Sequence, residues 1–242
     1  MSGQGDGDDD LRAQYRRLLQ RIEANEGEFR RLGRSVWRVQ EDERRRLARE
    51  LHDGIGQNLT ALKHRLALVA TELSPEQDAL RGKVEAAIGL CATTLEDTRE
   101  LSRLLRPPIL DDLGLEPALR WLARSLRESG GPEVELDIDA LPALDDDLQT
   151  LLFRVAQEAL NNTAKHAHAS QALLQLRQRG NELQMLIEDD GRGCDPALAL
   201  RSGGSGLGGM RERLRLYGGR FELRSTPGGG TQLLASILLD AA

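Results

Sequence analysis

The sequence is poor in aromatic residues, which make up 3% of its 242 positions. Its core must therefore be aliphatic, and binding of single-stranded nucleic acid on aromatic platforms is poorly supported. The formal net charge of −6 argues against a dedicated binder of polyanions, so we expect no nucleic-acid partner. The two cysteines, Cys91 and Cys194, match no metal-ligand spacing and fit a reduced compartment.

Long hydrophobic runs are also absent, and none approaches the roughly 18 residues that a bilayer-spanning helix needs. The first ten residues, MSGQGDGDDD, are acidic and glycine-rich, unlike the basic and then apolar start of a signal peptide. We therefore expect a cytoplasmic protein with no membrane segment in this chain. A segment upstream of it, or a membrane-bound partner, would add membrane association.

The N-terminal forty residues divide into a disordered acidic terminus at 1–10 and a coiled coil at 11–40. Apolar residues recur there in steps of three and four, as in a heptad seam. Asn25 occupies a seam position, where a buried amide fixes register at a cost in stability. The stripe consists of Leu11, Tyr15, Leu18, Ile22, Phe29, Leu32, Val36 and Val39.

Two long amphipathic helices are predicted next, the first continuing to Ser74 and the second running from Glu76 to Leu105. Pro75 and Pro107 end them, because proline disfavours helix at the residue before it. Such an αα-hairpin, at 41–106, is too thin to bury its apolar stripe alone. Two copies would form a four-helix bundle, so the pattern predicts a homodimer.

After a linker at 107–114 the pattern changes to strands mixed with helices, which indicates a separate α/β domain at 115–242. Alternation of apolar and polar residues predicts the strands, and apolar spacing predicts the helices. We expect strands at 134–138, 173–179 and 183–189, helices at 145–166 and 210–217, and two strands around a glycine-rich turn within 220–239.

Two glycine-rich segments flank predicted elements of this domain. Asp189 to Gly193 follows a strand, and Gly203 to Met210 precedes an arginine-rich helix. Glycines before a helix expose backbone N–H groups, which form an anion cradle together with the helix dipole. A carboxylate after a strand can accept a hydrogen bond from an exocyclic amine such as that of adenine. Taken alone, such a segment is more simply interpreted as a flexible surface loop.

A third segment lies on the helix predicted at 145–166. Glu158 and Asn162 are four residues apart and share a helical face. Two oxygen-bearing side chains suit Mg²⁺, which takes few protein ligands and completes its shell with phosphates and water. Lys165 and His166, one turn further, could meet phosphate oxygens. The alternative is an ordinary polar helix face that ends in a basic residue.

Together and in this order, these segments resemble the Bergerat-type ATP-binding domain of the GHKL group, with QEALNNTAKHA as N box, DDGRG as G1 box and GSGLGGM as G2 box. The resemblance implies an α/β sandwich that binds ATP and Mg²⁺. It implies that Asp189 hydrogen-bonds adenine and that Asn162 ligates Mg²⁺ with help from Glu158. The remaining residues that it implies at the nucleotide are Lys165, His166, Gly191, Gly193, Gly204, Gly206, Leu207, Gly208 and Thr231, with Gly204, Gly206 and Gly208 in a mobile lid. Cys194 departs from the usual aromatic residue after the G1 glycines.

The helical half carries His52 in the segment ERRRLARELHDGIGQ, which resembles the phosphoacceptor segment of the NarL/DesK class of sensor histidine kinases. The resemblance extends over most of 41–239. It implies a homodimeric kinase that phosphorylates His52 and passes the phosphoryl group to a response regulator, which for this class is of the NarL type. Asp53 would be the general base or orienting acceptor. In this class Gln57 is associated with dephosphorylating the partner.

Three further histidines show no comparable pattern, and two other functions are compatible with the same sequence. His64 has no adjacent carboxylate and lies about a third of a turn around the helix from His52. His166 and His168 lack the further ligands of a zinc site. The rival functions are a phosphatase that acts on the regulator and a non-catalytic ATP-binding dimerisation module.

Overall fold

The computed structural model describes the backbone of residues 5–201 and 205–239, and the side chains of 21, 24–200 and 206–239. The chain divides into two compact units, Val39–Ala118 and a second that joins Met1–Arg38 to Leu119–Ala242. One boundary falls inside helix α1 (Gly5–Arg49) and the other inside α5 (Leu115–Glu128). The finer division at residues 10, 40, 106 and 114 stays a prediction.

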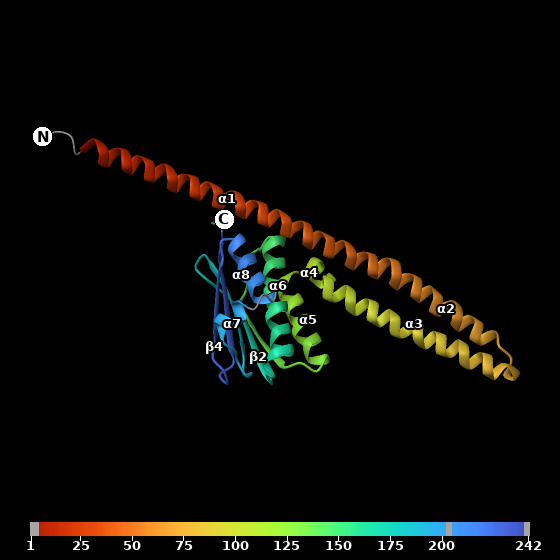
Figure 1. The fold of residues 1–242 in the computed structure, drawn as a ribbon. Coiled ribbons are helices and arrows are strands. Elements are labelled where there is room, and N and C mark those ends of the chain that lie inside the picture. Colours follow the sequence, from red (N-terminus) through yellow and green to blue (C-terminus); the bar gives the residue numbers. More distant parts are fainter. Residues whose placement is uncertain (1–4, 202–204, 240–242) are drawn as a thin grey trace. The chain divides into compact units, whose positions relative to one another are not determined.

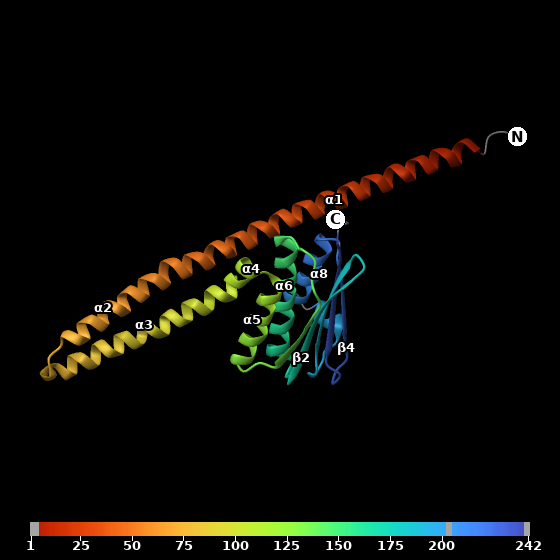
Figure 2. The same cartoon turned by 180° about the vertical axis from the view of Figure 1, so that it is seen from behind.

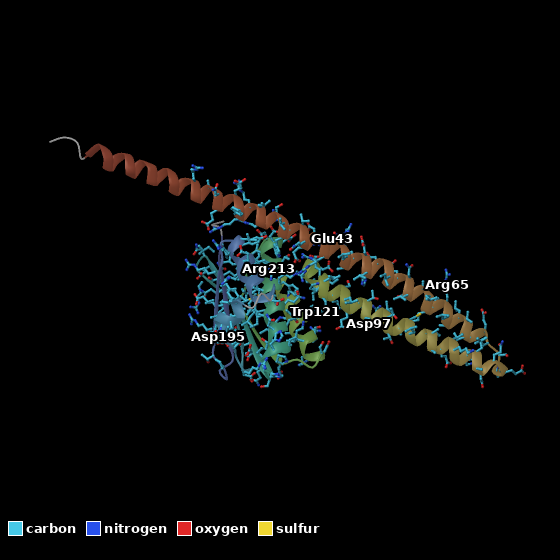
Figure 3. All side chains as sticks on the ribbon, viewed as in Figure 1. Glu43, Arg65, Asp97, Trp121, Asp195 and Arg213 are labelled. Atoms are coloured by element: carbon cyan, nitrogen blue, oxygen red, sulfur yellow. The ribbon has the colours of Figure 1, made fainter. Side chains whose placement is uncertain are left out.

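The unit at 39–118 is a helical hairpin in which α2 and α3 lie side by side and antiparallel (Figures 1 and 2). Ser74 begins the turn between them with a capping box, in which its backbone N–H donates to Oε1 of Gln77 at 3.0 Å. Figure 3 shows the charged side chains of Arg65 and Asp97 on the two arms, both exposed. After the end of α1, its elements are η1 (Glu50–Gly56), α2 (Gln57–Glu72), η2 (Pro75–Gln77), α3 (Asp78–Leu105) and α4 (Pro108–Leu113).

The first arm is not the uninterrupted α-helix that the sequence predicts. Residues Glu50–Gly56 form a π-helix, η1, which contains His52, and α-helix resumes at Gln57. A π-helix bonds residue i to i+5 and therefore turns less per residue, and such segments are frequent at functional sites. The lower winding rotates His64 toward the face of His52, so the predicted third of a turn between them is an overestimate.

The interior of the hairpin is narrow. Along α3 it contains Cys91, Leu95, Thr98 and Ser102, and the Ser102 hydroxyl donates to the carbonyl oxygen of Ala48 at 2.8 Å. Many large apolar side chains of this unit remain exposed: Val39, Leu47, Ile55, Leu62, Leu68, Val69, Leu80, Leu90, Leu101 and Leu104. The hairpin is therefore as thin as predicted, and it leaves many large apolar side chains uncovered.

The other unit contains a five-stranded sheet in the order β1-β2-β3-β5-β4. β1 pairs with β2 in parallel, and the remaining neighbours are antiparallel. All five predicted strands are present, and the predicted fold class of a helical hairpin followed by an α/β domain is confirmed. The strands are β1 (Glu133–Ile138), β2 (Gln171–Arg179), β3 (Glu182–Asp189), β4 (Arg220–Ser225) and β5 (Thr231–Leu238).

Helices α6 (Asp146–Asn162) and α8 (Ser205–Leu216) cover the sheet. Asp145 begins α6 as an N-cap, accepting the backbone N–H of Leu148 at 2.7 Å. Buried residues alternate along β2 and β3 because one face of the sheet meets these helices. Fully buried side chains at this layer include Phe153, Leu160, Leu174, Leu176, Met185, Met210 and Leu214. Within the described residues, no helix combines the length and apolar character needed to cross a membrane.

Two element boundaries differ from the prediction. The helix predicted at 145–166 ends as α-helix at Asn162 and continues as a π turn, η3 (Thr163–Ala167), which closes at His168 with φ +53°. The glycine-rich segment predicted to precede the helix at 210–217 is itself helical from Ser205. Gly206 lies in the first turn because its missing side chain permits close packing: an added Cβ would lie 2.1 Å from Oε1 of Glu158.

Candidate functional site

A cavity of about 500 Å³ lies among α6, η3, α8 and strands β3 and β5. It brings together most of the nucleotide-site residues predicted from the sequence: Glu158, Asn162, Lys165, His166, Asp189, Gly193, Gly206, Leu207 and Thr231. Gly191 and Gly208 do not line it, and Gly204 lies outside the described residues. Three segments far apart in the sequence therefore converge on one cavity.

Asp189 stands at the end of β3 with a fixed carboxylate. The Thr163 hydroxyl donates to its Oδ2 at 3.2 Å, and the backbone N–H of Gly191 donates to its Oδ1 at 3.0 Å. Thr231 is its partner across the β3–β5 ladder. The apolar side chains of Ile187 and Leu233 line the same cavity. A single oriented acceptor beside apolar walls suits a flat base with an exocyclic amine.

The glycines of the G1 box allow the loop after β3 to pack closely against neighbouring backbone, in addition to shaping the cavity. An added Cβ at Gly191 would lie 2.5 Å from the carbonyl oxygen of Ala167, which also accepts the Arg192 N–H at 2.7 Å. Gly193 has φ +62°, and an added Cβ would lie 2.0 Å from the carbonyl oxygen of Thr226. Both positions thus require glycine, for a close approach and for a left-handed backbone respectively.

The two adjacent aspartates have different environments. Asp190 accepts the backbone N–H groups of Ser170 and Gln171 at 2.8 and 3.0 Å and does not line the cavity. These contacts, with that of Gln171 the strongest, hold the pKa of Asp190 below its ordinary value. Asp190 therefore organises the start of β2, and Asp189 is the carboxylate that faces the cavity.

The face of α6 predicted to hold Mg²⁺ also borders the cavity. The Asn162 amide donates from Nδ2 to Oε1 of Glu158 at 3.4 Å, so the two polar side chains point to one place. Lys165 and His166 follow on η3. One carboxylate, one amide oxygen and nearby cationic groups fit a magnesium ion that shares phosphate oxygens. The residues present therefore fit the nucleotide and metal that the sequence predicts.

Neither the apolar wall of this cavity nor Thr163 was predicted from the sequence. The wall comprises Ala159, Ala167, Ile187, Ala199, Leu223 and Leu233. Alternation along the strands places Ile187 and Leu233 on the buried face, which is the signal that could have found them. Thr163 is next to Asn162 in sequence but carries no pattern that links it to Asp189.

His52 and Asp53, on η1, and Gln57, at the start of α2, are exposed. His52 borders two hollows of its own unit. One, of about 350 Å³, it shares with Gln57 and His64, and the other, of about 260 Å³, with Asp53 and Arg106. His64 therefore lines the same hollow as His52, although no sequence pattern groups the two histidines.

An ion-pair network borders the second hollow and fastens α4 to α1. Arg106 donates to Asp111 from Nε and Nη2 at 3.0 and 2.7 Å, and Arg45 donates from Nε at 2.8 Å. Arg106 also lies 3.6 Å from the carboxylate of Glu41, and both side chains are 7% exposed. Burial raises the pKa of Asp111, but the hydrogen bonds from Arg106 and Arg45 outweigh it and lower that pKa overall.

Comparison with known proteins identifies both halves of the chain. The family described as "Histidine kinase" matches residues 43–110, and the family described as "Histidine kinase-, DNA gyrase B-, and HSP90-like ATPase" matches residues 147–241. These ranges contain the helical hairpin with His52 and the sheet domain with the cavity, respectively.

Three curated relatives are similar over most of this chain. Sensor histidine kinase MctS of Rhizobium johnstonii is 37% identical over 80% of this chain and 42% of its own length. The histidine-protein kinase/phosphatase UhpB of Salmonella typhimurium is 38% identical over 88% of this chain and 42% of its own length. The histidine-protein kinase/phosphatase DegS of Brevibacillus brevis is 32% identical over 85% of this chain and 53% of its own length. The chain thus spans about half the length of the curated relatives that it matches.

The cavity with its three boxes, the hairpin with its exposed histidine and the two family matches agree with one another. The chain belongs to the histidine kinases, with the phosphoacceptor hairpin of the NarL class followed by an ATP-binding domain.

Proposed function

We propose that this chain phosphorylates its own His52 from Mg-ATP and passes the phosphoryl group to an aspartate of a response regulator. The observation that carries the proposal is the exposure of His52, which lies next to Asp53 on a π-helical turn. The second domain of the same chain has a cavity in which the Asp189 carboxylate and apolar walls fit adenine. An exposed imidazole can be reached both by a nucleotide and by a partner protein.

In the first step one imidazole nitrogen of neutral His52 attacks the γ-phosphorus, the bond to the β-phosphate oxygen breaks, and ADP leaves. Asp53 accepts or orients the proton of the other nitrogen. Asp189 orients the adenine, and Glu158 and Asn162 would hold Mg²⁺. When bound, the ion neutralises charge that develops on the phosphates, which is the main demand of phosphoryl transfer.

Two partners are proposed, a second copy of this chain and a response regulator. A second copy of the hairpin would cover the apolar side chains that the single hairpin leaves exposed, completing a four-helix bundle. The response regulator would be of the NarL type, because the hairpin is of that class. A dimer measured by light scattering and phosphotransfer to a NarL-type receiver domain are the expected results.

The test is incorporation of γ-labelled phosphate from Mg-ATP. Wild type should become labelled, and the label should be acid-labile and alkali-stable, as a phosphoramidate is. His52→Gln should remain unlabelled, while His64→Gln, which alters the other histidine of the same hollow, should retain the label. Unchanged labelling of His52→Gln would contradict the proposal. If loss of His52 altered no function of the protein, a non-catalytic ATP-binding docking module would replace the kinase as the proposed function.

A second activity is favoured by the position of Gln57. It borders the same hollow as His52, so it can orient a water molecule toward an aspartyl phosphate presented there. UhpB and DegS are named as kinase/phosphatases. Gln57→Ala should lengthen the lifetime of phosphorylated regulator and leave autophosphorylation nearly intact. Equal lifetimes with variant and wild type would remove Gln57 from this role.

A further inference from the structure

The C-terminal end of α8 packs against α1 within the unit that joins residues 1–38 to the ATP-binding domain. The ring of Tyr217, which follows α8, meets that of Trp37 edge to face, with centroids 5.6 Å apart and planes at 82°. The guanidinium of Arg34 lies 5.4 Å from the Tyr217 centroid. Aromatic pairs and cation–π contacts of this geometry are attractive beyond the area they bury.

Further contacts surround this aromatic pair. Arg38 of α1 forms an ion pair with Asp147 in the first turn of α6. Leu216 approaches Gly33 so closely that an added Cβ would lie 2.4 Å from Leu216 Cδ2. Trp37 is only 6% exposed as a result. Burial, and then the Asp147 carboxylate, raise the pKa of Tyr217 to about 12.

These contacts use a different face of α1 from the predicted coiled-coil seam. The seam residues Phe29, Leu32 and Val36 are 75%, 63% and 54% exposed. Arg34 and Trp37 lie on another side of the helix from these residues, and Gly33, four residues after Phe29, lies at the edge of the seam. Residues 26–38 of α1 can therefore hold a second copy on one face and the ATP-binding domain on another.

The opposite end of α8 belongs to the nucleotide cavity. Gly206 and Leu207, in its first turn, line that cavity, and Gly206 lies against Glu158. Met210 and Leu214, between the two ends, are fully buried. A helix of 12 residues is about 18 Å long, and rigid secondary elements of this kind can carry energetic coupling between two sites. A displacement of the Tyr217 end of α8 can therefore shift Gly206 and Leu207, which form part of the cavity wall.

We propose that the Tyr217 end of α8 is a docking surface for residues 26–38 of α1, and that α8 couples this docking to nucleotide binding. Docking holds the first turn of α8 against Glu158 and so keeps the cavity wall in place. A nucleotide that needs this wall binds the docked form more tightly, and by linkage it strengthens docking by the same factor. The inference rests on the proposed ATP binding and adds a route by which the state of α1 alters nucleotide affinity.

Two glycines of α1 give a matched test in the full chain. Gly33→Gln places a side chain against Leu216, whereas Gly27→Gln meets no atom within 4 Å. Both changes should strengthen the helix equally. The affinity for Mg²⁺ with the unhydrolysable β,γ-imido analogue of ATP is measured by calorimetry. Gly33→Gln should weaken it by about fivefold or more, the lower end of ordinary allosteric coupling. Gly27→Gln should match wild type.

A double-variant cycle of Trp37→Ala and Tyr217→Ala separates the contact from general damage to the fold. If both act through one contact, the double variant should bind the analogue no more weakly than either single variant. Multiplying effects, or a Gly33→Gln affinity equal to that of wild type, would overturn the proposal. Failure of wild type to bind the analogue would instead overturn the proposed function and this inference with it.

The docking contact also has a readout that needs no nucleotide. In a Trp121→Phe background, Trp37 is the only tryptophan, and its low exposure predicts weak quenching by acrylamide. Tyr217→Ala should raise the quenching constant. Equal quenching with and without Tyr217 would contradict docking even if the wild type binds nucleotide normally.

Discussion

Replacement of Gly206 by alanine tests whether the first turn of α8 is part of the metal and nucleotide site. The added Cβ would lie 2.1 Å from Oε1 and 3.1 Å from Cδ of Glu158, and 3.5 Å from Nδ2 of Asn162. The nearest atom is the end of a flexible side chain, so the carboxylate can move aside and the fold can persist. Its new position would no longer face Asn162 as in the structure.

The size of the effect follows from the role of Glu158. Disturbing a group that orients a metal site typically costs about 10- to 100-fold in metal affinity or activity. We therefore expect the affinity for Mg-ATP to fall by about tenfold or more, which is roughly 1.4 kcal/mol or more of binding free energy. Helix propensity acts in the opposite direction, because alanine stabilises a helix over glycine by about 1 kcal/mol.

The assay is calorimetric titration with Mg-ATP analogue beside a thermal unfolding curve. Gly89→Ala is the matched control, since Gly89 also lies inside a helix, α3, does not line the cavity, and an added Cβ there meets no atom within 4 Å. Gly206→Ala should lose affinity without losing its folding transition, and Gly89→Ala should keep both. Equal affinities of the two variants would refute the assigned position of the helix.

Two other substitutions probe the carboxylates. Asp189→Asn replaces one of the two carboxylate oxygens that accept from Thr163 and Gly191 by an NH2 donor, and it removes the negative charge. ATP affinity in a titration should therefore fall by about tenfold or more; unchanged affinity would exclude Asp189 as the adenine partner. Asp111→Asn should lower the free energy of unfolding by about 1–3 kcal/mol, toward the lower value because Arg45 is partly exposed. Because the pKa of Asp111 is lowered in the folded protein, its contribution is complete above the ordinary carboxyl pKa of about 4 and is lost as pH falls through the lowered value. The difference between wild type and Asp111→Asn in denaturant unfolding should thus shrink under acid conditions, and Asp112→Asn, one residue further, should show no such difference.

Much of the architecture could be predicted because local patterns carry it. Alternation along β2 and β3 marks strands with one buried face, and Pro75 marks the end of the first hairpin arm. The shared cavity could be predicted because the three boxes, in this order, resemble those of a known ATP-binding domain, and three boxes together are more specific than any one of them. The observed cavity contains Asp189, Glu158 and Asn162 together.

Other features depend on contacts that no local pattern shows. The π-helix at η1 changes which residues share the face of His52, and periodicity alone assumes a constant turn per residue. Gly206 was expected to lie in a mobile lid, whereas in the structure it lies in the first turn of α8, where the absence of a side chain lets the helix approach Glu158 closely. The packing of Trp37 on Tyr217 joins residues far apart in the sequence. The heptad pattern of α1 predicts a seam for a second copy, but it carries no sign of this contact with the ATP-binding domain.

The central claim is that His52 accepts the phosphoryl group, and peptide-resolved mass spectrometry tests it most directly. After incubation with Mg-ATP, digestion with trypsin at alkaline pH places His52 in Glu50–Lys63, His64 in the following dipeptide, and His166 and His168 in His166–Arg177. The account predicts one added phosphoryl group on Glu50–Lys63, lost on brief acid treatment. A phosphoryl group on His166–Arg177 or on the His64 peptide, with Glu50–Lys63 unmodified, would contradict it.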